Sequence, residues 1–145
     1  MSRDAPTVVV TAVGAAEGAR GAAAALACAD ADPDRATLLV DLDGRPPRPT
    51  LLASTAAREL EDRLAAHLPR TRVAARGQVC HLAAPADDDG FAAAAAAVTV
   101  ARGGLAVIHA PPPALQALLA SADAGEGPHA TGVLLRADVP VDRAL

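Results

Sequence analysis

The sequence contains no lysine, tryptophan or tyrosine, and Phe91 is its only aromatic residue. Without lysine, no segment can supply the ammonium group that a GxxxxGK[ST] phosphate loop places on ATP. No run reaches the roughly 18 consecutive apolar residues of a membrane-spanning helix, so no membrane segment is expected. The two cysteines, Cys28 and Cys80, are far apart and neither forms a metal-type pair, so we expect both to be reduced and buried.

The sequence also has little net charge. The formal net charge is −4 and the arginines are scattered, which excludes a general attraction to nucleic acid or acidic membranes. The segment 1–6 is short and charged, and a strand-like run follows it. A secretory signal would instead have a long apolar segment there, so a cytoplasmic protein is expected. A chain of 145 residues with 52% hydrophobic and 21% charged residues fits one globular domain.

Apolar runs and helical spacings alternate along the chain. Such alternation, without polar residues at every second strand position, predicts a mainly parallel sheet covered on both faces, a three-layer α/β/α fold of about five strands. The expected strands are 7–13, 36–43, 78–83, 105–109 and 131–136, with a short edge strand at 71–75. The expected helices are 21–29, 51–68, 91–102 and 114–122, and 44–49 is a proline-rich loop. The expected core includes Val8, Val10, Leu26, Leu38, Val40, Leu82, Val107, Ile108 and Leu134.

The first strand leads into a glycine-rich turn and then an alanine-rich helix. Gly14, Gly18 and Gly21 could let backbone N–H groups approach an anion at the helix N-terminus. Aligning GxxxxGK[ST] on Gly14 puts Ala19, Arg20 and Gly21 where Gly, Lys and Ser/Thr belong. Aligning one residue earlier puts Ala19 at the lysine and Arg20 at the hydroxyl position. Neither register gives a working phosphate loop.

Two interpretations of this turn stay open. The glycines either permit tight packing of strand on helix or keep a residual phosphate site, with Arg20 either on a phosphate or in solvent. The spacing Gly14-x3-Gly18-x2-Gly21, with Asp41 or Asp43 ending the second strand, also resembles a dinucleotide fingerprint loosely. Short-chain dehydrogenase chemistry needs Tyr and Lys and is excluded, whereas binding of NAD or NADP is not.

Other polar residues fall at strand ends and loops. Asp41 is expected to be a polar strand end, and His109 a partly exposed structural side chain, with pH sensing or ligation as its alternatives. The Cys80–His81 pair has no second metal pair nearby and is expected to be structural. Asp87 to Asp89 form an acidic, solvated loop that suits a helix N-cap.

Four segments, taken together and in order, resemble the MinD/ParA (SIMIBI) class of P-loop ATPases, most closely the CpaE/TadZ-type localisation ATPases of pilus and secretion systems. They are residues 8–27, the run Leu-Leu-Val-Asp-Leu-Asp at 38–43, Val-Cys-His-Leu-Ala-Ala-Pro at 79–85, and Leu-Ala-Val-Ile-His-Ala-Pro-Pro at 105–112. The resemblance covers roughly residues 7–136. It implies the sheet order 79–83, 36–42, 105–109, 7–13, 131–136.

The departures from that class bear on activity. The class's signature lysine falls at Gly14, its phosphate-loop lysine at Ala19 or Arg20, and its Walker B acid at His109. In the relatives, the positions of Asp41 and Asp43 lie near the switch segment and the nucleophilic water. A neutral imidazole does not replace a carboxylate on Mg²⁺, which prefers oxygen ligands.

The resemblance therefore implies a non-catalytic pseudo-ATPase that serves as a scaffold or binding module. Its expected partner is a protein or a second copy of the chain, and no cofactor is expected beyond residual ATP or ADP. The alternative is a Rossmann-type nucleotide- or dinucleotide-binding protein. A DNA-binding role, found in some relatives, is disfavoured by the acidic balance. We expect one domain over 1–145 that lacks the C-terminal part of the family fold, because residues 142–145 resemble the first turn of a further helix.

Overall fold

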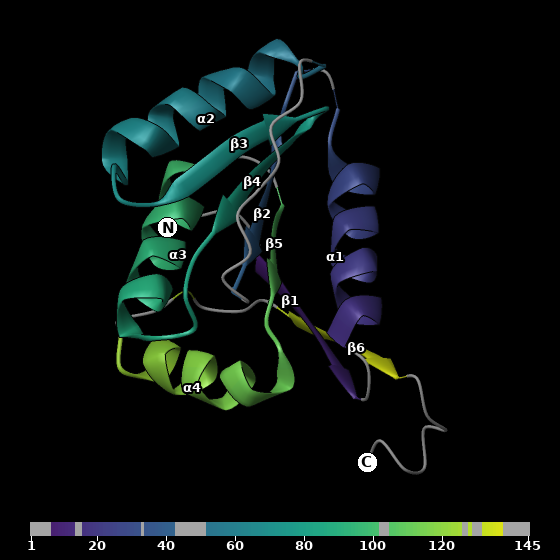
Figure 1. Ribbon diagram of the computed structural model, residues 1–145, viewed down its shortest axis with the longest axis vertical. Coiled ribbons are helices and arrows are strands. Elements are labelled where there is room, and N and C mark those ends of the chain that lie inside the picture. The colour runs from purple at the N-terminus through teal and green to yellow at the C-terminus, as the bar shows by residue number, and fades with distance from the viewer. Residues whose placement is uncertain are drawn as a thin grey trace.

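The computed structural model describes residues 7–13, 16–32, 34–42, 52–101, 105–125, 128 and 132–137; for 12–13, 16–20, 112 and 132–137 it describes the backbone alone. The described residues form ten elements, in chain order (Figure 1). They are β1 (Thr7–Val13), α1 (Ala16–Asp30), β2 (Thr37–Asp41), α2 (Thr55–His67), β3 (Arg72–Arg76), β4 (Val79–Ala83), α3 (Asp88–Val100), β5 (Ala106–His109), α4 (Pro112–Asp123) and β6 (Gly132–Ala137).

The six strands form one sheet in the order β3-β4-β2-β5-β1-β6. Every neighbouring pair is parallel except β3 and β4, which form an antiparallel pair at one edge. The strand order expected from the sequence is confirmed, and the short edge strand lies one residue further along than expected. All residues of β2 and β5 are buried, which explains their unbroken apolar runs.

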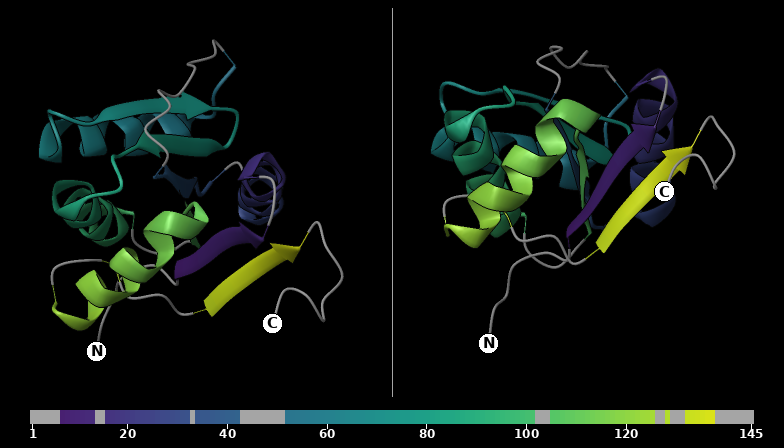
Figure 2. Two further views of the ribbon diagram at one scale, coloured as in Figure 1. Left: turned by 60° about the horizontal axis from the view of Figure 1, so that its bottom comes forward. Right: turned by 90° about the horizontal axis from the view of Figure 1, so that it is seen from below.

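Helices lie on both faces of this sheet (Figures 1 and 2). On one face, α1 packs Ala23 and Ala27 against Val10, Leu39 and Val107. On the other face, α2, α3 and α4 pack larger side chains against the sheet. That second core includes Leu60, Leu64, Phe91 and Leu118 from the helices and Leu38, Val40, Leu82 and Ile108 from the strands. The two faces thus differ in the size of the side chains that fill them.

Two of the helices begin at side-chain caps. Oγ of Ser54 accepts a hydrogen bond from the N–H of Ala57 at 3.1 Å, at the start of α2. Oδ1 of Asp87 accepts one from the N–H of Gly90 at 2.9 Å, at the start of α3. Each satisfies a backbone donor that a helix N-terminus leaves without an intrahelical partner. The cap predicted within the acidic loop is therefore confirmed, at its first residue.

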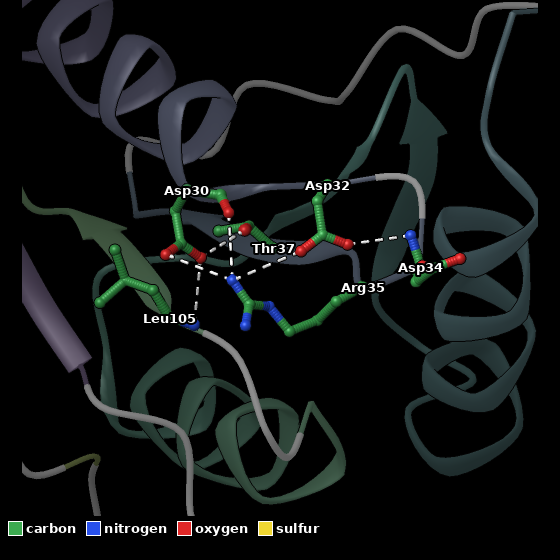
Figure 3. A network of polar contacts seen from close by, with 6 residues as sticks. All are labelled: Asp30, Asp32, Asp34, Arg35, Thr37 and Leu105. Atoms are coloured by element: carbon green, nitrogen blue, oxygen red, sulfur yellow. Dashed lines mark hydrogen bonds and ion pairs between the residues drawn. The ribbon is translucent and has the colours of Figure 1, made fainter.

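A polar network ties the end of α1 to the N-terminal ends of two strands (Figure 3). Oδ2 of Asp30 accepts hydrogen bonds from Oγ1 of Thr37 at 2.8 Å and from the N–H of Leu105 at 3.3 Å. Nη2 of Arg35 donates to the backbone oxygen of Asp30 at 3.2 Å and lies 3.6 Å from its Oδ1. The network fixes where α1 ends relative to β2 and β5.

Some expectations from the sequence need correction, and others concern residues outside the described ranges. α1 begins at Ala16 rather than near Gly21, because the Ala, Glu and Arg of this stretch favour helix. Cys28 is exposed on α1, although Cys80 is buried as expected and both thiols are free. Gly14, Asp43, the proline-rich loop 44–49 and residues 142–145 lie outside the described residues.

The expected core is largely confirmed. Val10, Leu38, Val40, Leu82, Val107 and Ile108 are buried. Val8 and Leu26 are only partly buried, at the margin of the α1 face, and the side chain of Leu134 is not described. In the described part of the chain, every helix is too short or too polar to span a bilayer.

Candidate functional site

The carboxyl ends of β1, β2 and β5 meet at one edge of the sheet. Backbone hydrogen bonds continue past the strands there: the N–H of Leu42 donates to the oxygen of His109 at 3.0 Å, and that of Ala110 to Val10 at 2.9 Å. β1 and β5 are neighbours, yet the helices that follow them, α1 and α4, lie on opposite faces. In open α/β sheets, ligands bind beside such a switch in direction at the strands' carboxyl ends.

Asp41 and His109 form a buried pair at this edge. The register places Asp41, the last residue of β2, beside His109, the last of β5. Their side chains lie on the α1 face, with Nδ1 of His109 2.9 Å from Oδ1 of Asp41. Asp41 is 2% exposed and His109 1% exposed. The expectation of a partly exposed structural histidine was wrong, because α1 and the neighbouring strands cover the imidazole.

The contact with Asp41 determines which nitrogen of the neutral imidazole carries the hydrogen atom. An ionised carboxylate can only accept hydrogen bonds, so the Nδ1–H of His109 donates to Asp41. In the neutral imidazole, Nε2 then carries the lone pair and is an acceptor. Nε2 of His109 is buried and has no hydrogen-bond partner among the described residues. A carboxylate that orients one imidazole nitrogen while the other faces away is an arrangement suited to accepting a proton or a hydrogen bond.

A third polar residue, His81 of β4, completes the cluster. Its Nε2 lies 3.9 Å from Oδ2 of Asp41, on the opposite side from His109. The sequence pattern predicts only a structural Cys80–His81 pair and does not predict that His81 lies beside Asp41. The signal was available: in adjacent parallel strands, residues of the same alternation share a face, and His81 lies opposite Leu39, two before Asp41.

A hollow of about 330 Å³ adjoins the three polar residues on the α1 face. Its apolar wall comes from small or aliphatic side chains, and Cys28 and Arg76 also line it. The full lining is Ala23, Ala24, Cys28, Leu39, Asp41, Arg76, Val79, His81 and His109. A larger hollow of about 630 Å³ lies between the end of α2 and the start of α3. Half of the residues that line it are exposed, and none of its titratable side chains is buried, so the smaller hollow is the better candidate site.

The glycines expected to cradle phosphate are placed differently from a phosphate loop. Only residues 14 and 15 separate β1 from α1, and Gly18, Arg20 and Gly21 all lie within the helix. Only the first four N–H groups of a helix lack an intrahelical acceptor, so the N–H of Gly21 is committed to the helix. The structure therefore brings Asp41 and His109 together but leaves Gly21, which is exposed, on the helix surface.

The residues at this edge do not fit Mg²⁺. Mg²⁺ takes oxygen ligands in near-octahedral geometry, and the carboxylate of Asp41 instead faces two imidazoles. Within the described ranges, no group of three or more His, Cys, Asp or Glu side chains is arranged to hold a metal ion. The described side chains at this edge form a hydrogen-bonded cluster.

Comparison with protein-family models, with curated proteins and with solved structures finds no match to this chain.

Proposed function

We propose that this chain is a binding module on a three-layer, P-loop NTPase-like α/β/α scaffold that does not transfer phosphoryl groups. Its partner is a protein or a second copy of the chain, and its location is cytoplasmic. The proposal keeps the MinD/ParA and CpaE/TadZ resemblance as an account of the scaffold. It assigns neither ATP hydrolysis nor a bound metal to the present protein.

One observation carries the proposal: the buried hydrogen bond between Asp41 and His109. At the position where the resemblance expects a Mg²⁺-orienting acid, the chain has an imidazole. That imidazole donates to the carboxylate that would otherwise face the nucleotide. Phosphoryl transfer depends on metal and cationic groups that neutralise phosphate charge, and within the described residues no group of three His, Cys, Asp or Glu side chains is arranged to hold a metal ion.

Supporting geometry comes from the strand order and from α1. The order β4-β2-β5-β1-β6 is the one that the resemblance implies, which favours the scaffold. The early start of α1 leaves little backbone between strand and helix to surround a phosphate. Both features agree with a scaffold that has kept its topology and lost its nucleotide chemistry.

Nucleotide turnover and binding test this proposal directly. ATP and GTP hydrolysis should not exceed a blank with Mg²⁺ present, and neither nucleotide should raise the melting temperature at millimolar concentration. A ligand present at a hundred times its dissociation constant would stabilise the fold by about 2.7 kcal/mol, which a thermal melt detects readily. Turnover that disappears in Arg20→Ala would refute the proposal.

The same melts examine the alternative. Stabilisation by NAD or NADP, without stabilisation by ATP, would favour a Rossmann-type dinucleotide-binding protein instead. Sedimentation velocity over a range of protein concentrations should reveal self-association if the partner is a second copy. A monomer at all concentrations would leave a different protein as the partner that the proposal requires.

A further inference from the structure

Nε2 of His109 is buried without a hydrogen-bond partner in the described part of the structure. Leaving a buried polar atom unsatisfied costs about 1–3 kcal/mol, so such atoms call for an explanation. The imidazole lines the 330 Å³ hollow on the α1 face. A ligand in that hollow could supply the missing hydrogen bond.

The hydrogen-bonding state of the pair selects the ligand group at this end. Because Asp41 accepts the Nδ1–H, Nε2 of the neutral imidazole needs a donor, such as a hydroxyl. With the imidazole neutral, a carboxylate is disfavoured at this end, because both Nε2 and a carboxylate oxygen are hydrogen-bond acceptors. Nε2 is shielded from bulk solvent, so a donor that binds there would have to displace the side chains at the inner end of the hollow.

The opposite end of the hollow carries a cation. Arg76, the last residue of β3, lies opposite Val79, the first residue of β4, whereas Asp41 lies opposite Ala83. Val79 and Ala83 are four residues apart along β4, which corresponds to about 13 Å of strand. Arg76 is exposed, and no hydrogen bond or ion pair joins it to another described residue. A guanidinium in this state is suited to a carboxylate, which it can bind with two parallel hydrogen bonds.

Between the two ends the wall is apolar. Ala23 and Ala24 of α1 face Leu39 and Val79 of the sheet. The hollow exists because α1 presents alanines here, where longer side chains would fill the space. Its volume lies at the lower end of the range for small-molecule pockets, roughly 300–1,000 Å³. An aliphatic segment of several carbons would suit this wall.

We infer that this hollow binds a small hydroxycarboxylic acid with an apolar middle. The carboxylate lies on Arg76, the hydroxyl donates to Nε2 of His109, and the aliphatic segment contacts Ala23, Ala24, Leu39 and Val79. The inference does not rest on the resemblance or on the absence of phosphoryl transfer. If the nucleotide experiments refute the proposed function, the inferred acid site is unaffected. If no acid binds, the proposed function is likewise unaffected.

The test uses probes that differ at one end. ω-Hydroxy acids with six, eight and ten carbons are titrated calorimetrically into the full chain, beside the matched simple acid and the matched diol. At least one hydroxy acid should bind, and both its simple acid and its diol should bind at least about tenfold more weakly, which corresponds to the loss of one good hydrogen bond each. No binding by any hydroxy acid, or equal binding of all three ligand types, would overturn the inference.

Two variants test whether the ligand lies in the hollow with its carboxylate at Arg76. Arg76→Gln, at an exposed position, should make the hydroxy acid and the diol bind equally, and Ala24→Leu should abolish binding by filling the hollow. Cys28 lines the hollow and is exposed, so bound ligand should also slow its alkylation in the unmodified protein. An unchanged affinity in both variants, or an unchanged alkylation rate at saturating ligand, would show that the ligand binds elsewhere.

Discussion

Replacing Gly90 with alanine should destabilise the fold through one close backbone approach. Gly90 lies in the first turn of α3 and is buried against the end of β4. A Cβ at this position would lie 1.7 Å from the carbonyl oxygen of Pro85 and 2.7 Å from its carbon. Ordinary van der Waals contact begins at 3.4 Å, twice the first distance. Because the obstructing atoms belong to the backbone, no side chain can turn away to relieve the clash.

The expected magnitude follows from two opposing terms. Forcing an extra carbon into a packed region costs about 1–3 kcal/mol, and the upper end applies where backbone must move. Alanine recovers up to about 1 kcal/mol through its greater helix propensity. The net loss should be about 2 kcal/mol, which lowers the melting temperature of a domain of this size by roughly 6 °C.

The assay is urea and thermal denaturation followed by far-ultraviolet circular dichroism, because the chain has no tryptophan or tyrosine for fluorescence. Gly21→Ala is the matched control. Gly21 is exposed within α1, and a Cβ there meets nothing within 4 Å. That variant should gain about 0.5–1 kcal/mol. A Gly90→Ala protein as stable as the parent would show that α3 does not approach Pro85 as described.

Three further predictions concern the thiols and the end of α1. Burial, and secondarily the charge of Glu61, raise the pKa of the Cys80 thiol from 9.0 to about 12. Thiol reagents at mildly alkaline pH should therefore modify Cys28 in the native protein and Cys80 only after unfolding; equal native rates would contradict this. Because the pKa of Cys80 is higher in the folded state, the thiol ionises first in the unfolded chain as the pH rises. The free energy of unfolding should therefore keep its full value below about pH 9 and fall by up to about 4 kcal/mol towards pH 12. In urea titrations, Cys80→Ala should reduce this alkaline loss, whereas Cys28→Ala should not. Asp30→Ala should lose about 1–3 kcal/mol by leaving two strand-end donors without their acceptor, whereas Asp32→Ala, on an exposed turn, should lose well under 1 kcal/mol in the same titrations.

The strand order could be predicted because each central strand is a short run of apolar residues between clear turn signals. β2 and β5 are buried throughout, so their sequences lack the polar alternation of a half-exposed strand and read as short apolar runs. The edge strand β3 was also recognisable, since it has arginine at both ends and glycine directly after it. Gly77, in that turn, has φ of 58°, a conformation that glycine adopts without strain.

The start of α1 was predicted less well because two signals compete there. The glycines favour a loop, while the surrounding Ala, Glu and Arg favour helix. Gly18 and Gly21 are tolerated inside α1 because each costs only about 1 kcal/mol relative to alanine. Glycine spacing alone therefore does not distinguish a phosphate loop from the first turns of an alanine-rich helix.

The polar pair required information that sequence pattern does not contain. The predicted order already made β2 and β5 neighbours, and both Asp41 and His109 end their strands. Whether two such side chains touch depends on the register of the strands and on the rotamers chosen beneath α1. The burial of both residues follows from that helix crossing their face, which no local sequence feature of either strand reports.

The unequal packing of the two faces links composition to the candidate site. The single aromatic residue, Phe91, and most of the large buried leucines lie on the face covered by α2, α3 and α4. The α1 face has mainly alanine and valine, which bury less apolar area and provide less stabilisation. Small side chains let α1 approach the sheet but leave a hollow beside Asp41, His81 and His109. A chain this rich in alanine thus has room for a ligand on the face where its own side chains contribute least, so a bound acid would stabilise the α1 face more than any other part of the fold.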